Sequence, residues 1–403
     1  MLFKNLYSWS YILLAAAMIA IGRVYDERIE VFGVNFSIIL SVLYIITSIP
    51  LLVSIRSIVL FPLKRLLYGF YFLIVFLTPI LWLYYGFPLE TKVAPGFERY
   101  YNFILIVIPI TIILIEKATE KEIHRFLHVL FILVFALSFL AAFGIQQTAN
   151  ESNRLSVLGG GAIIFARWLG FGIIYLFFSR RLNPAFRIIF ILLFVAFMLA
   201  TGSRGPILSL LLVSLAYLFF TFNRNFLKVG AFIFVLLIAF PVLKSSLDIS
   251  KLGNVDRILM NFSSHGIKKQ STSARVVFNA RSIDLVKNHP FGVGAGNWQM
   301  MANKEHPDHL IRHEYPHNIF LEIFSEYGLL TGVVFFLLII RVLYKCIFRI
   351  SSYSQEQGEY IMVYYLFLFY FLNAMVSGML VDSRLMFLII GLIICDKKLL
   401  YAK

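Results

Sequence analysis

Runs of apolar residues, each about 18 residues or longer, recur along the whole length of this 403-residue chain. A helix of that length can cross the hydrocarbon part of a bilayer while satisfying all of its own backbone hydrogen bonds. The composition agrees: 60% of the residues are hydrophobic and 14% are charged, whereas a soluble domain is about half apolar and a quarter charged. We therefore predict an all-α polytopic membrane protein, and we find no series of alternating segments of roughly ten residues that would suggest a porin-like barrel.

The apolar runs predict about twelve transmembrane helices. Their approximate ranges are 8–23, 34–54, 64–86, 100–116, 126–145, 160–179, 187–201, 205–222, 228–243, 317–340, 360–379 and 384–400. The seventh and eighth runs are separated only by the short sequence TGSRGP, so a single broken hairpin is an alternative to two full spans.

The basic residues predict the orientation of these helices. Lysine and arginine are concentrated in the even-numbered short loops and in the C-terminal tail, and such loops face the cytoplasm. Both termini are then cytoplasmic, and the long polar segment 244–316 lies on the outer side, as a loop domain between spans nine and ten. We accordingly divide the chain into helices one to nine (1–243), the outer loop domain (244–316) and helices ten to twelve (317–403).

The net charge of +15 raises the question of nucleic-acid binding. No soluble basic domain is present in the sequence to bind nucleic acid. The excess of basic over acidic residues is explained by the lysines and arginines that set the orientation of the helices and by a site for an anion. We expect no nucleic-acid partner.

One segment of the outer loop, Ser273–Lys287, is predicted to form an amphipathic helix. Val276, Ala280 and Ile283 recur in it at helical spacing. The His-Pro pair that follows, beginning at His289, is a helix-terminating signal. The loop therefore contains at least one regular element.

The sequence GVGAGNW follows this helix and contains three closely spaced glycines, Gly292, Gly294 and Gly296. A glycine-rich loop can cradle phosphates. This one follows no buried strand and lacks the lysine of a P-loop, so it predicts a tight structural turn in preference to a nucleotide site.

Four arginines are predicted to face the outer side near membrane depth: Arg154, Arg204, Arg275 and Arg281. The guanidinium group is a planar fork of donors that suits phosphate oxygens, and converging arginines indicate a multiply charged anion such as a lipid pyrophosphate. The alternative for each is a side chain that snorkels to lipid head groups. This alternative is weakest for Arg204, which lies in a Gly-Ser-Arg-Gly-Pro break. Arg275 and Arg281 are about 240° apart around a helix, so we expect one of them to be structural.

His317 follows Pro316 at the point where the loop re-enters the tenth predicted span. Histidine titrates near neutral pH and is the commonest general base in enzymes. We therefore regard His317 as a candidate catalytic base. The alternative is a helix-start residue that is hydrogen-bonded to the backbone.

Histidines recur at spacings of three and four residues, which could place metal ligands on one face of a helix. They are His306, His309, His313 and His317. Pro307 and Pro316 interrupt any helix that could place them on one face, and the neighbouring Lys304 and Arg312 disfavour a cation. We therefore predict no metal ligands.

Together these features resemble the O-antigen ligase and O-antigen polymerase superfamily of bacterial inner membranes. The resemblance rests first on the pattern His-Asn-x9-Gly-x-x-Thr, formed by His317, Asn318, Gly328 and Thr331. It rests also on the large outer loop, on its Ser-x-Arg helix with the following Pro-Phe-Gly-Val-Gly-x-Gly-Asn, and on the earlier Ser-Arg-Gly. These motifs extend over about residues 150–332.

The resemblance implies an enzyme that moves a glycan from undecaprenyl pyrophosphate to an acceptor hydroxyl at the periplasmic face, without a metal or other cofactor. It implies that His317 is the essential histidine and that Arg204 and Arg275 are essential arginines. Arg154 matches an arginine ahead of the sixth span in some members. Arg281 fits a loose Arg-x10-Gly pattern of polymerases.

We therefore expect an inverting, metal-independent glycosyltransferase of the inner membrane. His317 takes a proton from the acceptor, the arginines bind pyrophosphate, and Asn318 and Gly328 support the site. The expected partners are the lipid-linked donor, the acceptor, the bilayer and a chain-length-regulating co-polymerase.

Two alternatives remain at this point. The Arg154–Gly161 segment and the glycine turn favour a polymerase, whose acceptor is another lipid-linked repeat unit, over a ligase, whose acceptor is lipid A-core. A transporter or flippase with an arginine-lined path is an alternative of another class. The absence of an internal repeat and the polar residues gathered on one face argue against it.

Overall fold

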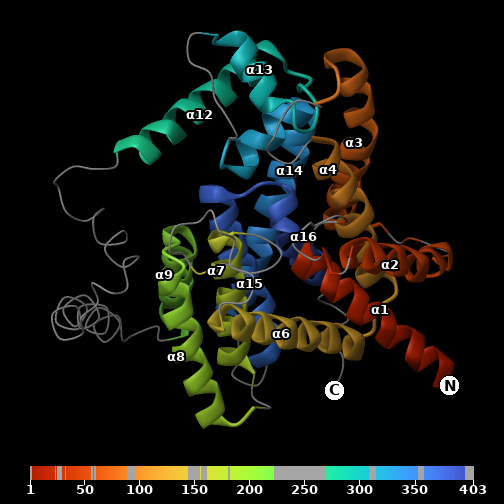
Figure 1. Cartoon of the computed structure of the whole chain (residues 1–403), viewed down its shortest axis with the longest axis vertical. Coiled ribbons are helices and arrows are strands. Elements are labelled where there is room, and N and C mark those ends of the chain that lie inside the picture. The colour runs from red at the N-terminus through yellow and green to blue at the C-terminus, as the bar shows by residue number, and fades with distance from the viewer. Residues whose placement is uncertain are drawn as a thin grey trace. The chain divides into compact units, whose positions relative to one another are not determined.

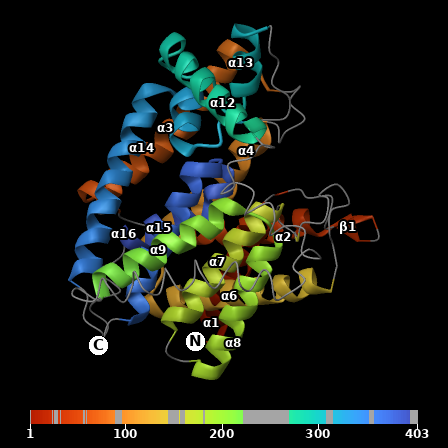
Figure 2. The ribbon, with the colours of Figure 1, turned by 90° about the vertical axis from the view of Figure 1, so that its left-hand side faces the viewer.

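The computed structural model describes residues 2–22, 24, 30–31, 33–55, 58, 60–88, 96–143, 155, 161–179, 182–221, 269–307, 315–352 and 358–394. Almost all of these residues are helical (Figures 1 and 2). The ninth predicted span, residues 244–268 of the predicted loop domain, and Arg154 lie outside the described residues.

The N-terminal part of the chain contains α1 (Leu2–Ile21), α2 (Phe36–Val53), α3 (Pro62–Tyr85), α4 (Gly96–Asn102), the π-helix η2 (Phe103–Val107), α5 (Ile108–Glu116) and α6 (Glu120–Ala142). Two short antiparallel strands, β1 (Glu30–Val31) and β2 (Val34–Asn35), lie between α1 and α2. Asn35 then begins α2, since its side-chain oxygen accepts hydrogen bonds from the first free backbone N–H groups of the helix.

The remaining elements follow in three groups. The first contains α7 (Ala162–Phe178), α8 (Pro184–Ala200) and α9 (Arg204–Thr221). The second contains α12 (Lys269–Asn288) and α13 (Trp298–Glu305). The third contains α14 (Ile319–Ser351), α15 (Gly358–Ser377), the short 3-10 helix η5 (Val381–Ser383) and α16 (Arg384–Ile394).

The prediction of an all-α membrane protein is confirmed at this level. Among the described residues, five helical segments are long and apolar enough to cross a bilayer: 36–53, 62–85, 98–116, 120–141 and 360–377. Shorter apolar helices occur at 7–21, 162–178, 184–200 and 204–220. The count of twelve spans, and the orientation, stay predictions.

Two helix boundaries differ from the expectation. The broken-hairpin region forms two separate helices, α8 and α9, which three residues connect. The tenth predicted span, 317–340, is part of a longer helix that bends at Gly328 and continues to Ser351. The basic residues after position 340 therefore lie on a helix and not in a loop.

The chain divides into two compact units. The first comprises residues 1–130, 267–347 and 374–403, and the second comprises 131–266 and 348–373. In the first unit α16 is buried along its whole length, and Phe387 of this helix stacks on Phe70 of α3. In the second unit α7 is buried on almost every face, because Gly170 and Gly172 let the rings of Phe369 and Phe194 approach its backbone.

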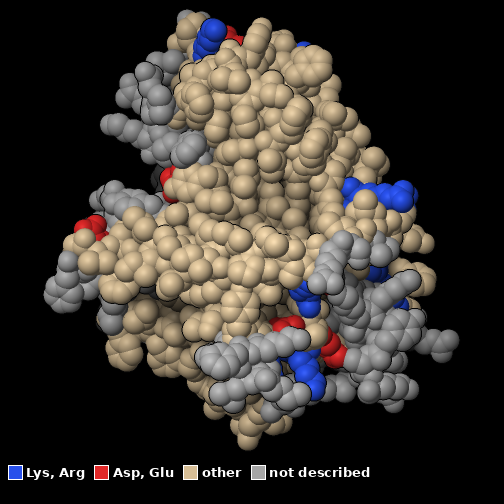
Figure 3. All heavy atoms as spheres, turned by 90° about the vertical axis from the view of Figure 1, so that its right-hand side faces the viewer, with Lys and Arg blue, Asp and Glu red and all other residues tan. Residues whose placement is uncertain are grey.

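The surface of the first unit includes a broad apolar face. Figure 3 views the chain from the side on which α2 and α3 lie in Figure 1, and most of this face carries no charged side chain. Large apolar side chains of α3 are exposed, among them Phe72, Phe76 and Leu83. Such a face suits contact with lipid and would be costly in water.

Candidate functional site

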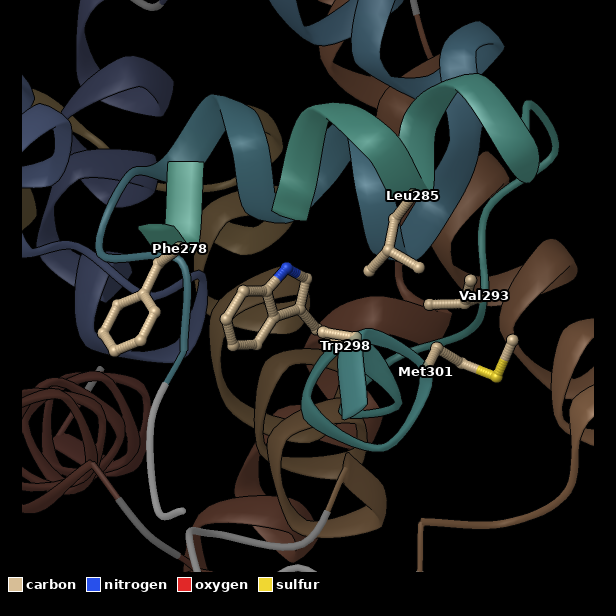
Figure 4. Packing of buried hydrophobic residues seen from close by; sticks show 6 residues of the cluster. Phe278, Leu285, Val293, Trp298 and Met301 are labelled. Atoms are coloured by element: carbon tan, nitrogen blue, oxygen red, sulfur yellow. The ribbon is translucent and has the colours of Figure 1, made fainter. Parts of the chain in front are cut away.

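Helices α12 and α13 enclose a small apolar core in the first unit. Phe278 and Leu285 project from α12 toward the indole ring of Trp298 on α13 (Figure 4). The rings of Phe278 and Trp298 meet edge to face at 5.8 Å between centroids. The indole N–H donates a hydrogen bond of 2.9 Å to the Ser282 hydroxyl. The core therefore fixes the two helices to each other.

The predicted helix in the loop is confirmed, but the apolar stripe that predicts it is not the face that the structure buries. Val276 and Ile283 are 64% and 46% exposed, and Ala280 is also exposed. The buried face contains Phe278 and Leu285, which pack against Trp298. As expected, α12 ends immediately before His289 and Pro290.

The glycine-rich segment forms a turn that packs against the bend of α14. The backbone φ angles of Gly292, Gly294 and Gly296 are +91°, +91° and +78°. Residues that carry a side chain rarely adopt such positive angles. At Gly328 of α14 φ is +82°, and a Cβ atom there would lie 2.4 Å from the Phe291 carbonyl. The two chain segments can approach this closely only because both carry glycine.

Backbone hydrogen bonds join this turn to α14 on both sides of the bend. The N–H groups of Val293 and Gly294 donate to the carbonyls of Ser325 and Glu326 at 3.0 and 2.8 Å. The N–H of Leu329 donates to the Pro290 carbonyl at 2.8 Å. Gly328, which we expected to support the site, therefore permits the junction between loop and helix.

The end of α3 holds the other side of the turn. The indole N–H of Trp82 donates to the Ala295 carbonyl at 3.0 Å. The amide Nδ2 of Asn297 donates to the carbonyls of Gly86 and Val293 at 3.0 and 2.9 Å. The turn is thus attached to two helices, α3 and α14.

His317 lies at the N-terminal end of α14 with a left-handed backbone. Its φ angle is +57°, the one positive value at a non-glycine position among the described residues. Its ring lies 3.9 Å from the ring of Tyr315 and 6.0 Å from that of Phe278, measured between centroids. Uncommon backbone conformations of this kind cluster at functional sites, so the conformation supports a functional role.

The neighbouring Asn318 caps α14. Its Oδ1 accepts hydrogen bonds from the N–H groups of Phe320 and Leu321 at 2.9 and 3.3 Å. Its Nδ2 donates to the Met375 carbonyl at 3.1 Å. The helix-start function that we considered for His317 therefore belongs to Asn318, and this residue also connects α14 to the end of α15.

The two loop arginines flank Phe278 on α12. Each is three residues from Phe278, so each is displaced from it by about 60° around the helix, on opposite sides. Arg281 is buried, with 6% of its surface exposed, and burial lowers the pKa of its guanidinium. Arg275 is half-buried. The structure thus brings both arginines near the face of α12 that contacts His317.

Arg204 begins α9 in the second unit, after a tight turn. The Thr201 hydroxyl donates to the Met198 carbonyl at 2.7 Å and accepts from the Ser203 N–H at 3.2 Å. Gly202 has a φ of +62°. A cation at a helix N-terminus opposes the helix dipole, and a bound anion would relieve that repulsion. Arg167, another arginine of this unit, is buried.

Three buried charged residues on α14 and α4 form a group that the sequence analysis does not identify. Glu322 and Glu326 of α14 are each 1% exposed, and Arg99 of α4 is 8% exposed. Nη1 of Arg99 lies 3.8 Å from Oε1 of Glu326, whereas Oε2 of Glu322 accepts a hydrogen bond from the Leu380 N–H at 2.9 Å. The sequence does contain a signal for this group. Two acids lie four residues apart in a predicted span, where a charge is costly and usually has a function.

The histidines of the loop do not gather into a metal site in the part that the structure describes. No group of three or more potential ligands occurs among those residues. His289 instead lies between the Tyr85 hydroxyl and the Glu305 carboxylate, 3.0 Å from each. His309 and His313 lie outside the described residues.

A comparison of the sequence with protein families found a match to part of the chain. Residues 188–336 match the model of the family described as O-antigen ligase. The match contains Arg204, Arg275, Arg281 and His317, and it confirms the resemblance to the O-antigen ligase and polymerase superfamily. No curated protein matches the chain.

Proposed function

We propose that this membrane protein, whose residues 188–336 match the model of the family described as O-antigen ligase, is a glycosyltransferase of the bacterial inner membrane. Its donor is a glycan linked to undecaprenyl pyrophosphate. Its site faces the periplasm, and both termini are cytoplasmic. Membership of the superfamily supports a lipid-linked donor and a glycan-bearing acceptor in general terms.

The conformation of His317 is the observation that carries the proposal. His317 has a left-handed backbone, and its half-buried imidazole contacts two aromatic rings, one of them on a helix that also bears two arginines. This arrangement combines a group that accepts a proton with groups that bind an anion. Those are the two requirements for displacing a pyrophosphate by a hydroxyl.

The proposed reaction follows from these roles. His317 accepts the proton of the acceptor hydroxyl while its oxygen forms a bond to the anomeric carbon. The bond from that carbon to the pyrophosphate oxygen breaks, and undecaprenyl pyrophosphate leaves with the electron pair. Arg204 and Arg275, with Arg154 and Arg281, bind the pyrophosphate and stabilise the charge that develops on it. Attack opposite the leaving group inverts the anomeric configuration.

We favour a polymerase, whose acceptor is a second lipid-linked repeat unit, and a co-polymerase that regulates chain length is the expected partner. The Arg154–Gly161 segment and the glycine turn of the sequence support this choice. A ligase that uses lipid A-core as acceptor is the second candidate, and the family match is compatible with either acceptor.

The test uses the purified protein in liposomes with one lipid-linked repeat unit, with and without lipid A-core, in the presence of EDTA. A ladder of glycan lengths from the repeat unit alone supports a polymerase. Product that appears only with lipid A-core supports a ligase. Movement of the lipid between leaflets without a new glycosidic bond would contradict both. His306→Ala, a substitution of a half-buried histidine at the end of α13, is the matched control for a histidine substitution that leaves transfer unchanged.

A further inference from the structure

Phe291, which immediately precedes the first glycine of the glycine turn, is 82% exposed. No other large apolar residue that the structure describes has a higher exposed fraction. Its backbone lies against the bend of α14, since a Cβ atom on Gly328 would lie 2.4 Å from the Phe291 carbonyl. A ring so exposed is unfavourable in water and suits an apolar surrounding.

One stripe of exposed apolar residues leads along α3 toward this turn. Its members recur at intervals of three or four residues and are each at least 47% exposed: Phe72, Phe76, Ile80 and Leu83. This spacing places them on one face of the helix. Because α3 is long and apolar enough to cross a bilayer, the stripe suits contact with lipid.

A second stripe begins on α14 directly after the bend. Its members again recur at intervals of three or four residues, and each is between 44% and 62% exposed: Leu330, Val333, Leu337 and Ile340. The tenth predicted span contains all four. Large apolar residues aligned on an exposed face mark an interaction surface, and within a predicted span that surface suits lipid.

The glycine turn joins both helices where the two stripes end. A Cβ atom on Gly294 would lie 3.0 Å from the ring of Trp82, about one helical turn before α3 ends at Tyr85. The Leu329 N–H of α14 donates to the Pro290 carbonyl. With 24 residues, α3 is about 36 Å long, whereas the hydrocarbon core of a bilayer is about 30 Å thick. The ends of α3 therefore lie near the two interfaces, and the turn lies near one of them.

The turn presents Phe291 on a fixed support. The N–H groups of Val293 and Gly294 are bonded to α14, and Trp82 of α3 is bonded to the Ala295 carbonyl. On the other side of Phe291, His289 lies 3.0 Å from the Tyr85 hydroxyl and 3.0 Å from the carboxylate of Glu305 on α13. Because the backbone is already held, insertion of the ring into lipid orders little additional chain.

We propose that Phe291 is a membrane anchor: its ring inserts into the leaflet on the side of the α12–α13 core and completes the lipid-facing surface of α3 and α14. The bilayer occupies this surface, and not a second copy of the chain or another protein, because the surface continues the apolar stripes of both helices. Aromatic residues are common anchors at the membrane interface. The anchor holds the α12–α13 core close to the membrane and does not depend on the proposed glycosyl transfer.

The test measures the surroundings of single nitroxide labels by electron paramagnetic resonance, with the full-length chain in phosphatidylcholine liposomes. Each label is attached to one introduced cysteine in a background that carries Cys346→Ala and Cys395→Ala. Phe291→Cys is the test position. Leu337→Cys on the α14 stripe is the control in lipid, and Lys304→Cys on the exposed side of α13 is the control in water. Oxygen concentrates in lipid and a nickel chelate in water, so the ratio of their collision rates with the label reports its surroundings.

We expect the ratio of oxygen to nickel collision rates at Phe291→Cys to be at least about threefold that at Lys304→Cys, as for an anchor at the interface. It should approach the ratio at Leu337→Cys. A ratio equal to that at Lys304→Cys would place the position in water and overturn the proposal. Low collision rates with both reagents would show that protein covers the position, and would overturn it as well.

The unsubstituted protein provides a second measurement if a labelled variant does not accumulate. The liposomes then contain a phosphatidylcholine with a photoactivatable diazirine near the head group, and mass spectrometry locates the adducts. We expect at least about threefold more adducts on residues 290–292 than on residues 303–305. Equal adduct levels on the two segments would contradict the anchor. Neither measurement involves glycosyl transfer, so failure of the anchor and failure of the proposed function are separate results.

Discussion

Helix α2 and the α12–α13 core bury opposite kinds of residue. On α2 the buried positions are Ser37, Ser41, Tyr44 and Ser48, whereas large apolar residues such as Ile38, Val42 and Ile46 are exposed. In the loop core the buried residues are Phe278, Leu285 and Trp298, and Lys287 and Asn288 are exposed. One region has the pattern of a helix in lipid, and the other has the pattern of a domain in water.

The difference indicates that two forces stabilise one chain. In water, apolar area is driven together by the hydrophobic effect. In lipid that drive is missing, and helices associate through close packing of small residues and through hydrogen bonds. His317 lies where two such environments meet. Phe278 of the α12–α13 core contacts its ring, and α14 follows it in the chain. A polar reaction on a lipid-linked substrate requires a site at such a boundary.

The largest expected effect tests the α12–α13 core, whose buried residues are apolar. Trp298→Ala removes a buried side chain around which both loop helices pack, and such substitutions cost about 3–5 kcal/mol. Hydrogen exchange should show α12 and α13 opening while α2 keeps its protection. An equal loss of protection in α2 would mean that the two regions do not differ in the way described here.

A matched pair of lysine substitutions tests the two environments directly. Ile46 of α2 and Val276 of α12 are similarly exposed, at 59% and 64%. Ile46→Lys should cost about 2.5–3.5 kcal/mol if the position is near the bilayer centre, whereas Val276→Lys should stay within about 0.5 kcal/mol, as surface changes in water do. The cost of each substitution is measured from the expression level and from the unfolding midpoint in detergent-free bilayers. A similar cost for Val276→Lys would show that this face of α12 lies in lipid.

Arg204→Lys is expected to have the smallest effect of the three. A cation that only snorkels to head groups is replaced well by lysine, whereas one that grips pyrophosphate loses its bidentate fork. We expect transfer to fall about tenfold, because a charge-assisted hydrogen bond contributes roughly 1.5–3 kcal/mol. Initial rates at saturating acceptor measure the effect, and wild-type rates would assign Arg204 to the lipid boundary alone.

The sequence predicted the helical class, the loop helix and its end, the glycine turn and the family. These features depend on local signals: apolar runs, a His-Pro pair and glycines at positions that require positive φ. The buried face of α12 could not be predicted from periodicity, because apolar residues lie on both sides and the partner, Trp298, was needed to choose.

The same limit applies to the polar contacts. The amide of Asn297 binds the carbonyl of Gly86, which lies far away in the sequence, so local signals could not predict this contact. The capping role of Asn318 was local and predictable, since asparagine ahead of an apolar run is a helix-start signal. We had assigned that role to its neighbour as an alternative.

The measurement that tests the central claim most directly is the transfer rate of His317→Gln. Glutamine can still hydrogen-bond an acceptor hydroxyl but cannot take its proton at neutral pH. Loss of a general base typically costs about 10²–10⁴-fold. We expect this variant to be nearly as inactive as His317→Ala at normal protein abundance. A fully active His317→Gln protein with an intact glycan product would contradict the mechanism.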